Sequence, residues 1–124
     1  MFSMMKILVV DDDKDMCEIL SDFLKDEGYL VIIAYDGEVA LNSIENRNYD
    51  LLILDYRLHG IDGLHVLKKA HQIDASLIAI MMSAFGSEQI RSQAQELGAY
   101  DFVEKPFDME RMVTTVNQAL SQVK

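Results

Sequence analysis

The chain alternates between short apolar runs and stretches in which apolar residues recur at helical spacing. A continuous apolar run predicts a strand buried on both faces, because a strand with one wet face would alternate apolar and polar side chains. The segment 51–55 is the clearest example, since four large apolar residues end in Asp55. The predicted strands are residues 6–10, 29–34, 51–55, 77–82 and 100–104.

Five amphipathic helices are predicted to follow these strands, one after each. Asp62 is the expected cap of the third helix, the last helix is expected to start near Asp108, and Gly28 is expected to end the first helix. The alternation indicates an α/β fold with one doubly wound, five-stranded parallel sheet covered by helices on both faces. The expected buried positions are Met16, Ile19, Leu20, Phe23 and Leu24; Ala40, Leu41 and Ile44; Leu64, Leu67 and Ala70; Ile90, Ala94 and Leu97; and Met109, Met112, Val113, Val116 and Leu120.

The length, the net charge and the cysteine content of the chain limit the kinds of protein that it can be. At 124 residues the chain is expected to form one domain, residues 1–124, in which 1–5 are a short lead. Eleven basic and 21 acidic side chains give a net charge of −10, which argues against direct binding of nucleic acid or of anionic membranes. A single cysteine, Cys17, excludes an internal disulfide. Without a predicted membrane span or signal peptide, we expect a cytoplasmic protein.

Polar residues with matching chemistry follow four of the predicted strands. Asp11 and Asp12 follow the first, Asp55 ends the third, Ser83 follows the fourth and Lys105 follows the fifth. The carboxyl ends of parallel strands share one edge of the sheet, where open α/β sheets bind their ligands. Carboxylates brought together there would repel one another unless a cation lay among them, and oxygen ligands suit Mg²⁺. An aspartate can also attack phosphorus as a nucleophile.

Ordered motifs at these strand ends resemble the receiver domain of response regulators, the phosphoacceptor module of two-component signalling. The motifs are Val9-Val10-Asp11-Asp12, Leu54-Asp55 with Gly60 and Asp62-Gly63 behind it, Ser83-Ala84, and Lys105-Pro106-Phe107. The resemblance extends from Lys6 to the last helix. It implies the flavodoxin-like strand order 2-1-3-4-5, in which the first and third strands are neighbours.

The resemblance implies a phosphorylation site and a metal site. Asp55 would carry the phosphoryl group. Mg²⁺, for which Mn²⁺ could substitute, would be held by Asp11, Asp12 and Asp55 together with the backbone carbonyl of Arg57. No other cofactor is implied.

It also assigns contacts around the phosphoryl group. Ser83 and Lys105 would touch its oxygens, and the peptide bond from Lys105 to Pro106 would be cis. Phe102 occupies the position of an aromatic residue that moves inward as Ser83 moves toward the phosphate. Three positions depart from the commoner family pattern, since His59 replaces proline, Ser83 replaces threonine and Phe102 replaces tyrosine.

The implied function is a signalling switch rather than an enzyme that turns over a separate substrate. A sensor histidine kinase or a histidine phosphotransfer protein would donate the phosphoryl group, which is then slowly lost to water. A downstream protein would bind through the fourth helix, the fifth strand and the fifth helix, and phosphorylation could drive dimerisation. The kinase and the downstream partner stay open.

Two other functions fit these residues less well. A Mg²⁺-dependent phosphatase with Asp55 as nucleophile usually has an acidic residue two positions later, where this chain has Arg57. A flavin carrier needs a phosphate-binding first loop, which the acidic residues 11–13 oppose. Asp13 and Asp15 are expected to be first-turn helix acids rather than ligands. We expect the three histidines, His59, His65 and His71, on the surface.

Overall fold

The computed structural model describes residues 4–84 and 86–121 and contains a five-stranded parallel sheet. The strand order is β2-β1-β3-β4-β5, which confirms the predicted doubly wound topology. Each predicted strand is present with its boundaries shifted by at most one residue. The strands are β1 (Lys6–Val10), β2 (Leu30–Ala34), β3 (Leu51–Asp55), β4 (Ile78–Ser83) and β5 (Asp101–Glu104).

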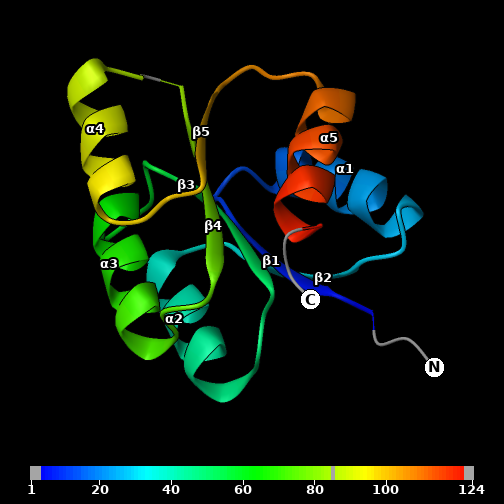
Figure 1. Cartoon of the computed structure of the whole chain (residues 1–124), viewed down its shortest axis with the longest axis horizontal. Coiled ribbons are helices and arrows are strands. Elements are labelled where there is room, and N and C mark those ends of the chain that lie inside the picture. The colour runs from blue at the N-terminus through cyan, green and yellow to red at the C-terminus, as the bar shows by residue number, and fades with distance from the viewer. Residues whose placement is uncertain (1–3, 85, 122–124) are drawn as a thin grey trace.

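Five helices form the two outer layers. Figure 1 shows α1 and α5 on one face of the sheet and α2, α3 and α4 on the other. Their bounds are α1 (Lys14–Asp26), α2 (Gly37–Asn46), α3 (Gly63–Ile73), α4 (Glu88–Glu96) and α5 (Met109–Leu120). None of the helices in the described ranges is long and apolar enough to cross a membrane.

The central strands supply two separate cores because successive side chains point to opposite faces. In β3, Leu52 and Leu54 pack with the α2, α3 and α4 side, whereas Leu51 and Ile53 pack with α1 and α5. All four side chains are fully buried. Both faces of β3 are therefore dry along its whole length, and the strand meets water only at its end.

Aspartate side chains begin the helices that follow the site strands. Asp62 caps α3 by accepting the backbone N–H of His65 at 2.9 Å, and Asp108 caps α5 through Glu110. Asp13 caps α1 through the N–H of Met16. These caps satisfy backbone donors that a helix leaves unpaired at its start. The predicted cap role of Asp62 and the predicted start of the last helix near Asp108 are confirmed. Asp15 lies in the first turn of α1 as expected, whereas Asp13 is the N-cap just before it.

Two predicted burial patterns are wrong. Ile19 and Phe23 of α1 are 48% and 39% exposed, because the helix packs through a narrower stripe that includes the buried Cys17. His71 is half-buried instead of lying on the surface. Its ring nitrogens lie 2.8 Å from the carbonyl oxygen of Leu77 and 2.9 Å from that of Leu97, the cap residue of α4.

Gly63 lets the start of α3 come close to the end of β3. A Cβ atom added at Gly63 would lie 2.4 Å from the carbonyl oxygen of Asp55 and 2.8 Å from the Cα of Tyr56. The backbone N–H of Gly63 donates to the carbonyl of Tyr56 at 2.7 Å. Any larger residue would therefore displace the backbone that carries Asp55.

Gly63→Ala should lower the free energy of unfolding by about 1–3 kcal/mol, because the added methyl group overlaps backbone that cannot rotate away. Urea unfolding measures this loss. Gly60→Ala is the control, since Gly60 has φ of +90° but no atom within 4 Å of an added Cβ. Its cost should be limited to about 1–2 kcal/mol of left-handed strain. Equal stability of Gly63→Ala and the wild type would contradict the close approach.

Candidate functional site

The sheet register aligns the polar residues that follow the strands. Val10 of β1 pairs with Leu54 of β3, so the next residues, Asp11 and Asp55, lie side by side. Asp55 in turn pairs with Met82 of β4, one residue before Ser83. Asp11, Asp55 and Ser83 are buried, which is unusual for polar side chains and places them under the edge of the sheet rather than on its surface.

Lys105 reaches this edge from the end of β5. Its Nζ donates to Oδ2 of Asp11 at 2.5 Å and lies 3.4 Å from Oδ2 of Asp55. The other oxygen of Asp11 accepts the backbone N–H of Asp13 at 3.0 Å. The fully buried Asp11 carboxylate is thus paired on both oxygens, as a buried charge requires.

The ends of β4 and β5 are joined at the same place. The backbone N–H of Lys105 donates to the carbonyl of Ser83 at 2.9 Å, and Ser83 pairs with Glu104 in the ladder. The peptide bond from Lys105 to Pro106 is cis, the geometry that the family resemblance implies. Ser83 and Lys105 are therefore linked directly through their backbones.

Three carboxylates at this edge could hold a metal ion. One oxygen each from Asp11, Asp12 and Asp55 lies within 4.8 Å of the other two. Asp11 and Asp55 are buried, and Asp12 is exposed, so the group opens to solvent on one side. A hard divalent cation such as Mg²⁺ prefers such oxygen ligands and keeps several waters. The donor set fits this ion. Arg57 is exposed in the turn after β3.

Burial and neighbouring charges together shift the pKa values of Asp55 and Lys105. Burial first, and then the nearby charge of Asp11, raise the pKa of Asp55 to about 6, although Lys105 opposes this. Burial alone would lower the pKa of Lys105, but its hydrogen bond to Asp11 and the charges of Asp11 and Asp55 outweigh burial and raise it. Lys105 therefore stays a cation. At Asp55, the positive charge of Lys105 does not fully offset burial and the charge of Asp11.

Comparisons with known proteins agree with this geometry. The profile of the response regulator receiver domain matches residues 7–117. The chain belongs to the response regulator receiver domain family. It is therefore a phosphoacceptor switch of two-component signalling, as the motifs indicate.

Relatives and solved structures of this receiver domain are similar over nearly its whole length. The transcriptional regulatory protein CpxR of Escherichia coli is 41% identical over 120 residues, 94% of this chain and 50% of CpxR. ZraR of Salmonella typhimurium, also a transcriptional regulatory protein, is 36% identical over 95% of this chain and 27% of ZraR. A CheY-like receiver domain from Methanospirillum hungatei has a TM-score of 0.94 at 28% identity, covering 97% and 96% of the two chains.

The receiver domain spans between a quarter and a half of the length of these two curated relatives. Their printed names describe regulators of transcription, so the expectation that no nucleic acid is bound directly is not confirmed. Nothing in these comparisons supports the phosphatase alternative. The similarity to these relatives thus covers the receiver domain alone and does not show which activity the phosphoacceptor switch controls.

Phe102 of the receiver domain, the expected switch residue, is buried between β5 and α4. Its ring packs into the core on the α4 side, and the guanidinium of Arg91 lies 4.8 Å from the ring centre. Arg91 also donates to the carbonyl of Phe102 at 3.4 Å and pairs with Glu104 at 3.3 Å. Arg91 was missed by the sequence analysis, because a helix-surface arginine gives no sign of a partner 11–13 residues away.

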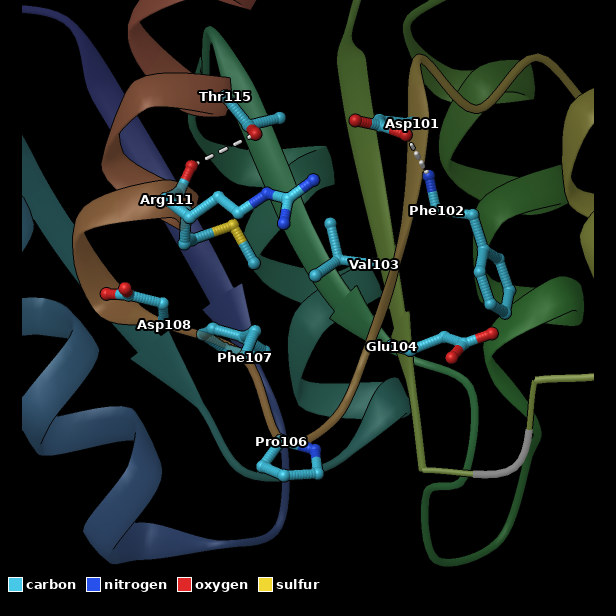
Figure 2. A pocket seen from close by; sticks show the side chains of 10 residues that line it. Asp101, Phe102, Val103, Glu104, Pro106, Phe107, Asp108, Arg111 and Thr115 are labelled. Atoms are coloured by element: carbon cyan, nitrogen blue, oxygen red, sulfur yellow. Dashed lines mark hydrogen bonds between the residues drawn. The ribbon is translucent and has the colours of Figure 1, made fainter.

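A surface pocket of about 430 Å³ lies on the other side of β5, away from the acidic group. Figure 2 shows its lining from β5, from the turn at Pro106 and from α5, with Phe102 and Glu104 projecting to one side of β5 and Val103 to the other. The side chain of Arg111 extends along this pocket. The pocket belongs to the predicted partner-binding region rather than to the phosphoacceptor chemistry.

The raised pKa of Asp55 predicts a pH-dependent stability. Because the folded pKa of about 6 exceeds the ordinary value of 3.8, the folded state binds a proton more readily than the unfolded chain. Stability contributed by this group is therefore lost as the pH rises through that window. Asp55→Asn should exceed the wild type in stability by roughly 2–3 kcal/mol more at about pH 7.5 than at about pH 4.

Urea unfolding in EDTA, at both pH values, measures this difference. Comparing the two proteins cancels the titration of groups that do not interact with Asp55. Asp15→Asn is the control, since Asp15 is exposed at the start of α1. A stability advantage of Asp55→Asn that does not change with pH would show that folding does not raise the pKa of Asp55.

Proposed function

We propose that Asp55 accepts the phosphoryl group and that Asp11 and Asp12, with Asp55 and the backbone carbonyl of Arg57, hold the Mg²⁺ that the reaction needs. The observation that carries the proposal is the buried Asp55 carboxylate, which lies 3.4 Å from the Lys105 ammonium inside a group of three acids. Asp55 is accessible only at the open end of its strand, so an incoming phosphoryl group meets it end-on.

In this proposal a carboxylate oxygen of Asp55 attacks phosphorus in the donor. The new O–P bond forms as the bond from phosphorus to the donor's imidazole nitrogen breaks, and the imidazole keeps that electron pair. A bound divalent cation supplies positive charge to the transferring oxygens. Lys105 supplies a second, fixed charge, and the Ser83 hydroxyl donates to a phosphoryl oxygen.

The acquired group changes charge at the point where β3, β4 and β5 end. Ser83 would be drawn toward the phosphate, and because its carbonyl accepts the N–H of Lys105, the β5 end would follow. Phe102 and Arg91 then transmit the change to α4. Only Ala94 is buried among the residues of α4, so this helix has little packing to lose when it moves.

The partners in this proposal follow from the family. A histidine kinase or a histidine phosphotransfer protein donates the phosphoryl group, and a downstream protein binds at α4, β5 and α5, with phosphorylation-dependent dimerisation as one outcome. Residues 1–124 act as one receiver domain, with 1–5 preceding the first strand, and as a switch without turnover of a separate substrate. The single buried thiol of Cys17 supports a cytoplasmic location.

Acetyl phosphate with Mg²⁺ should add one phosphoryl group, about 80 Da, to the wild-type protein but none to Asp55→Asn. The variant should stay unlabelled because the carboxamide of asparagine does not act as a nucleophile toward phosphorus. Intact mass spectrometry with and without EDTA measures the labelling, and EDTA should abolish it. Asp15→Asn, an exposed acid near the site, should label like the wild type. Metal-independent labelling, or full labelling of Asp55→Asn, would refute the assignment.

Arg91→Ala should loosen α4. The variant loses the contact with the Phe102 ring and the pair with Glu104, which together are worth about 1 kcal/mol at this exposure. Amide hydrogens of residues 88–97 should then exchange about fivefold faster. Glu88→Gln is the matched control, because it removes the 4.0 Å pair with Arg91 and the acidic charge in the first turn of α4 but leaves the contacts of Arg91 with β5 in place. Unchanged exchange in Arg91→Ala would show that Arg91 does not hold the helix.

A further inference from the structure

The imidazole of His71 connects three elements on the α4 side of the protein. Its Nδ1 lies 2.9 Å from the carbonyl oxygen of Leu97, the cap residue of α4, and its Nε2 lies 2.8 Å from that of Leu77. His71 belongs to the last turn of α3, and Leu77 immediately precedes β4. One half-buried ring therefore bridges the end of α3, the start of β4 and the end of α4.

The chain that leaves α4 also passes close to this ring. A Cβ atom added at Gly98 would lie 3.1 Å from Cε1 and 3.3 Å from Nδ1 of His71. Gly98 has φ of +93° and directly follows the cap of α4, so it is the residue that turns the chain away from the helix. The imidazole is therefore packed against the turn that ends α4 as well as bonded to it.

The two carbonyl oxygens need two donors. Both distances fall within the range of about 2.7–3.2 Å for an N–H···O hydrogen bond. A carbonyl oxygen only accepts, and a neutral imidazole carries one N–H and one bare nitrogen that also accepts. In the neutral ring, one nitrogen would therefore face an oxygen with lone pair against lone pair. Only the protonated, positively charged ring donates to Leu77 and Leu97 at once.

The ionisable groups that flank the ring on the surrounding elements do not pair with it. They are Lys68 and Asp74 around the end of α3, Glu96 at the end of α4 and Tyr100 after it, whereas residues 75–80 contribute none. The Asp74 carboxylate accepts the backbone N–H and the hydroxyl of Ser76. The ion pairs formed within residues 4–84 and 86–121 do not include His71. His71 therefore responds to two carbonyl oxygens rather than to a carboxylate partner.

We propose that His71 is a pH-sensitive link that sets how firmly the end of α4 is attached to α3 and β4. The protonated ring makes both hydrogen bonds, and its charge is stabilised by the carbonyl end of the helix. Loss of one proton breaks one of the two bonds. Histidine is the side chain that ordinarily changes charge between pH 5 and 8, so the attachment weakens as the pH rises through this range.

This link gives α4 an input that is separate from the phosphoryl group. Because the proposed switch moves α4, the movement would be easier at higher pH, when one bond of His71 is lost. The link itself exists in the unphosphorylated protein and does not rest on the assignment of Asp55. Its test can therefore be made without any phosphoryl donor or metal ion.

Hydrogen exchange followed by NMR tests the proposal. The amides of Leu97, Gly98 and Ala99 donate to carbonyls of α4 and report the opening of its end. Protection factors remove the intrinsic pH dependence of exchange. For these amides they should fall about 5- to 20-fold between about pH 5.5 and about pH 8, since a charge-assisted hydrogen bond and a favourable helix-end charge are lost.

The variants separate His71 from other titrating groups. His71→Gln keeps an amide donor but does not titrate, so its protection factors should change less than about twofold over the same range. His65→Gln is the matched control, because His65 is exposed on the same helix, and it should retain the full pH dependence. All proteins carry Asp55→Asn, since the Asp55 carboxyl group, with a pKa of about 6, would otherwise titrate in this window.

The nitrogen NMR shifts of the His71 ring give a second readout, which a purely structural role would not require. Both nitrogens should carry a proton at the lower pH, and one should lose it at the higher pH. Protection that does not change with pH, a change that persists in His71→Gln, or a ring that is neutral throughout would overturn the proposal. Failure of the wild type to label at Asp55 would refute the proposed function and leave these results unaffected.

Discussion

The pairing of one lysine with two buried carboxylates is the interaction on which the rest of this structure depends. Asp11 is fully buried, and an unpaired charge in that position would cost several kcal/mol. Lys105 removes that cost, but its ammonium lies closer to Asp11 than to Asp55. At Asp55, burial and the neighbouring Asp11 charge outweigh Lys105 and raise the pKa of the carboxyl group. The fold therefore contains a carboxylate that gains from any added positive charge.

This arrangement requires the sheet order that the chain adopts. β4 lies between β3 and β5, so Lys105 must extend across the end of β4 to reach both aspartates. The hydrogen bond from its backbone to Ser83 fixes the starting point of that extension. The ends of β3, β4 and β5 are therefore directly connected, which supports the proposed switch with its output at α4, β5 and α5.

The sequence predicted what depends on strand ends and missed what depends on distant packing. Asp11, Asp55, Ser83 and Lys105 each follow an apolar run, and parallel strands bring such positions to one edge. The contact of Arg91 with Phe102 gives no such signal, because neither residue's spacing predicts it. Nor does spacing show which part of an apolar helix stripe is buried. For that reason Ile19 and Phe23 were assigned wrongly to the core.

The packing of α4 is consistent with the proposed role of this helix as the mobile element. The two cores are built on the central strands, and α4 contributes one fully buried residue, Ala94. Ile90 adds a partly buried apolar contact with this core, and further attachment comes from Arg91 and from His71, which contacts the carbonyl of Leu97. Polar contacts of about 1 kcal/mol each are small enough for a phosphoryl group to outweigh. Burial of the central strands thus holds the domain together, whereas α4 is attached by one buried residue and a few polar contacts.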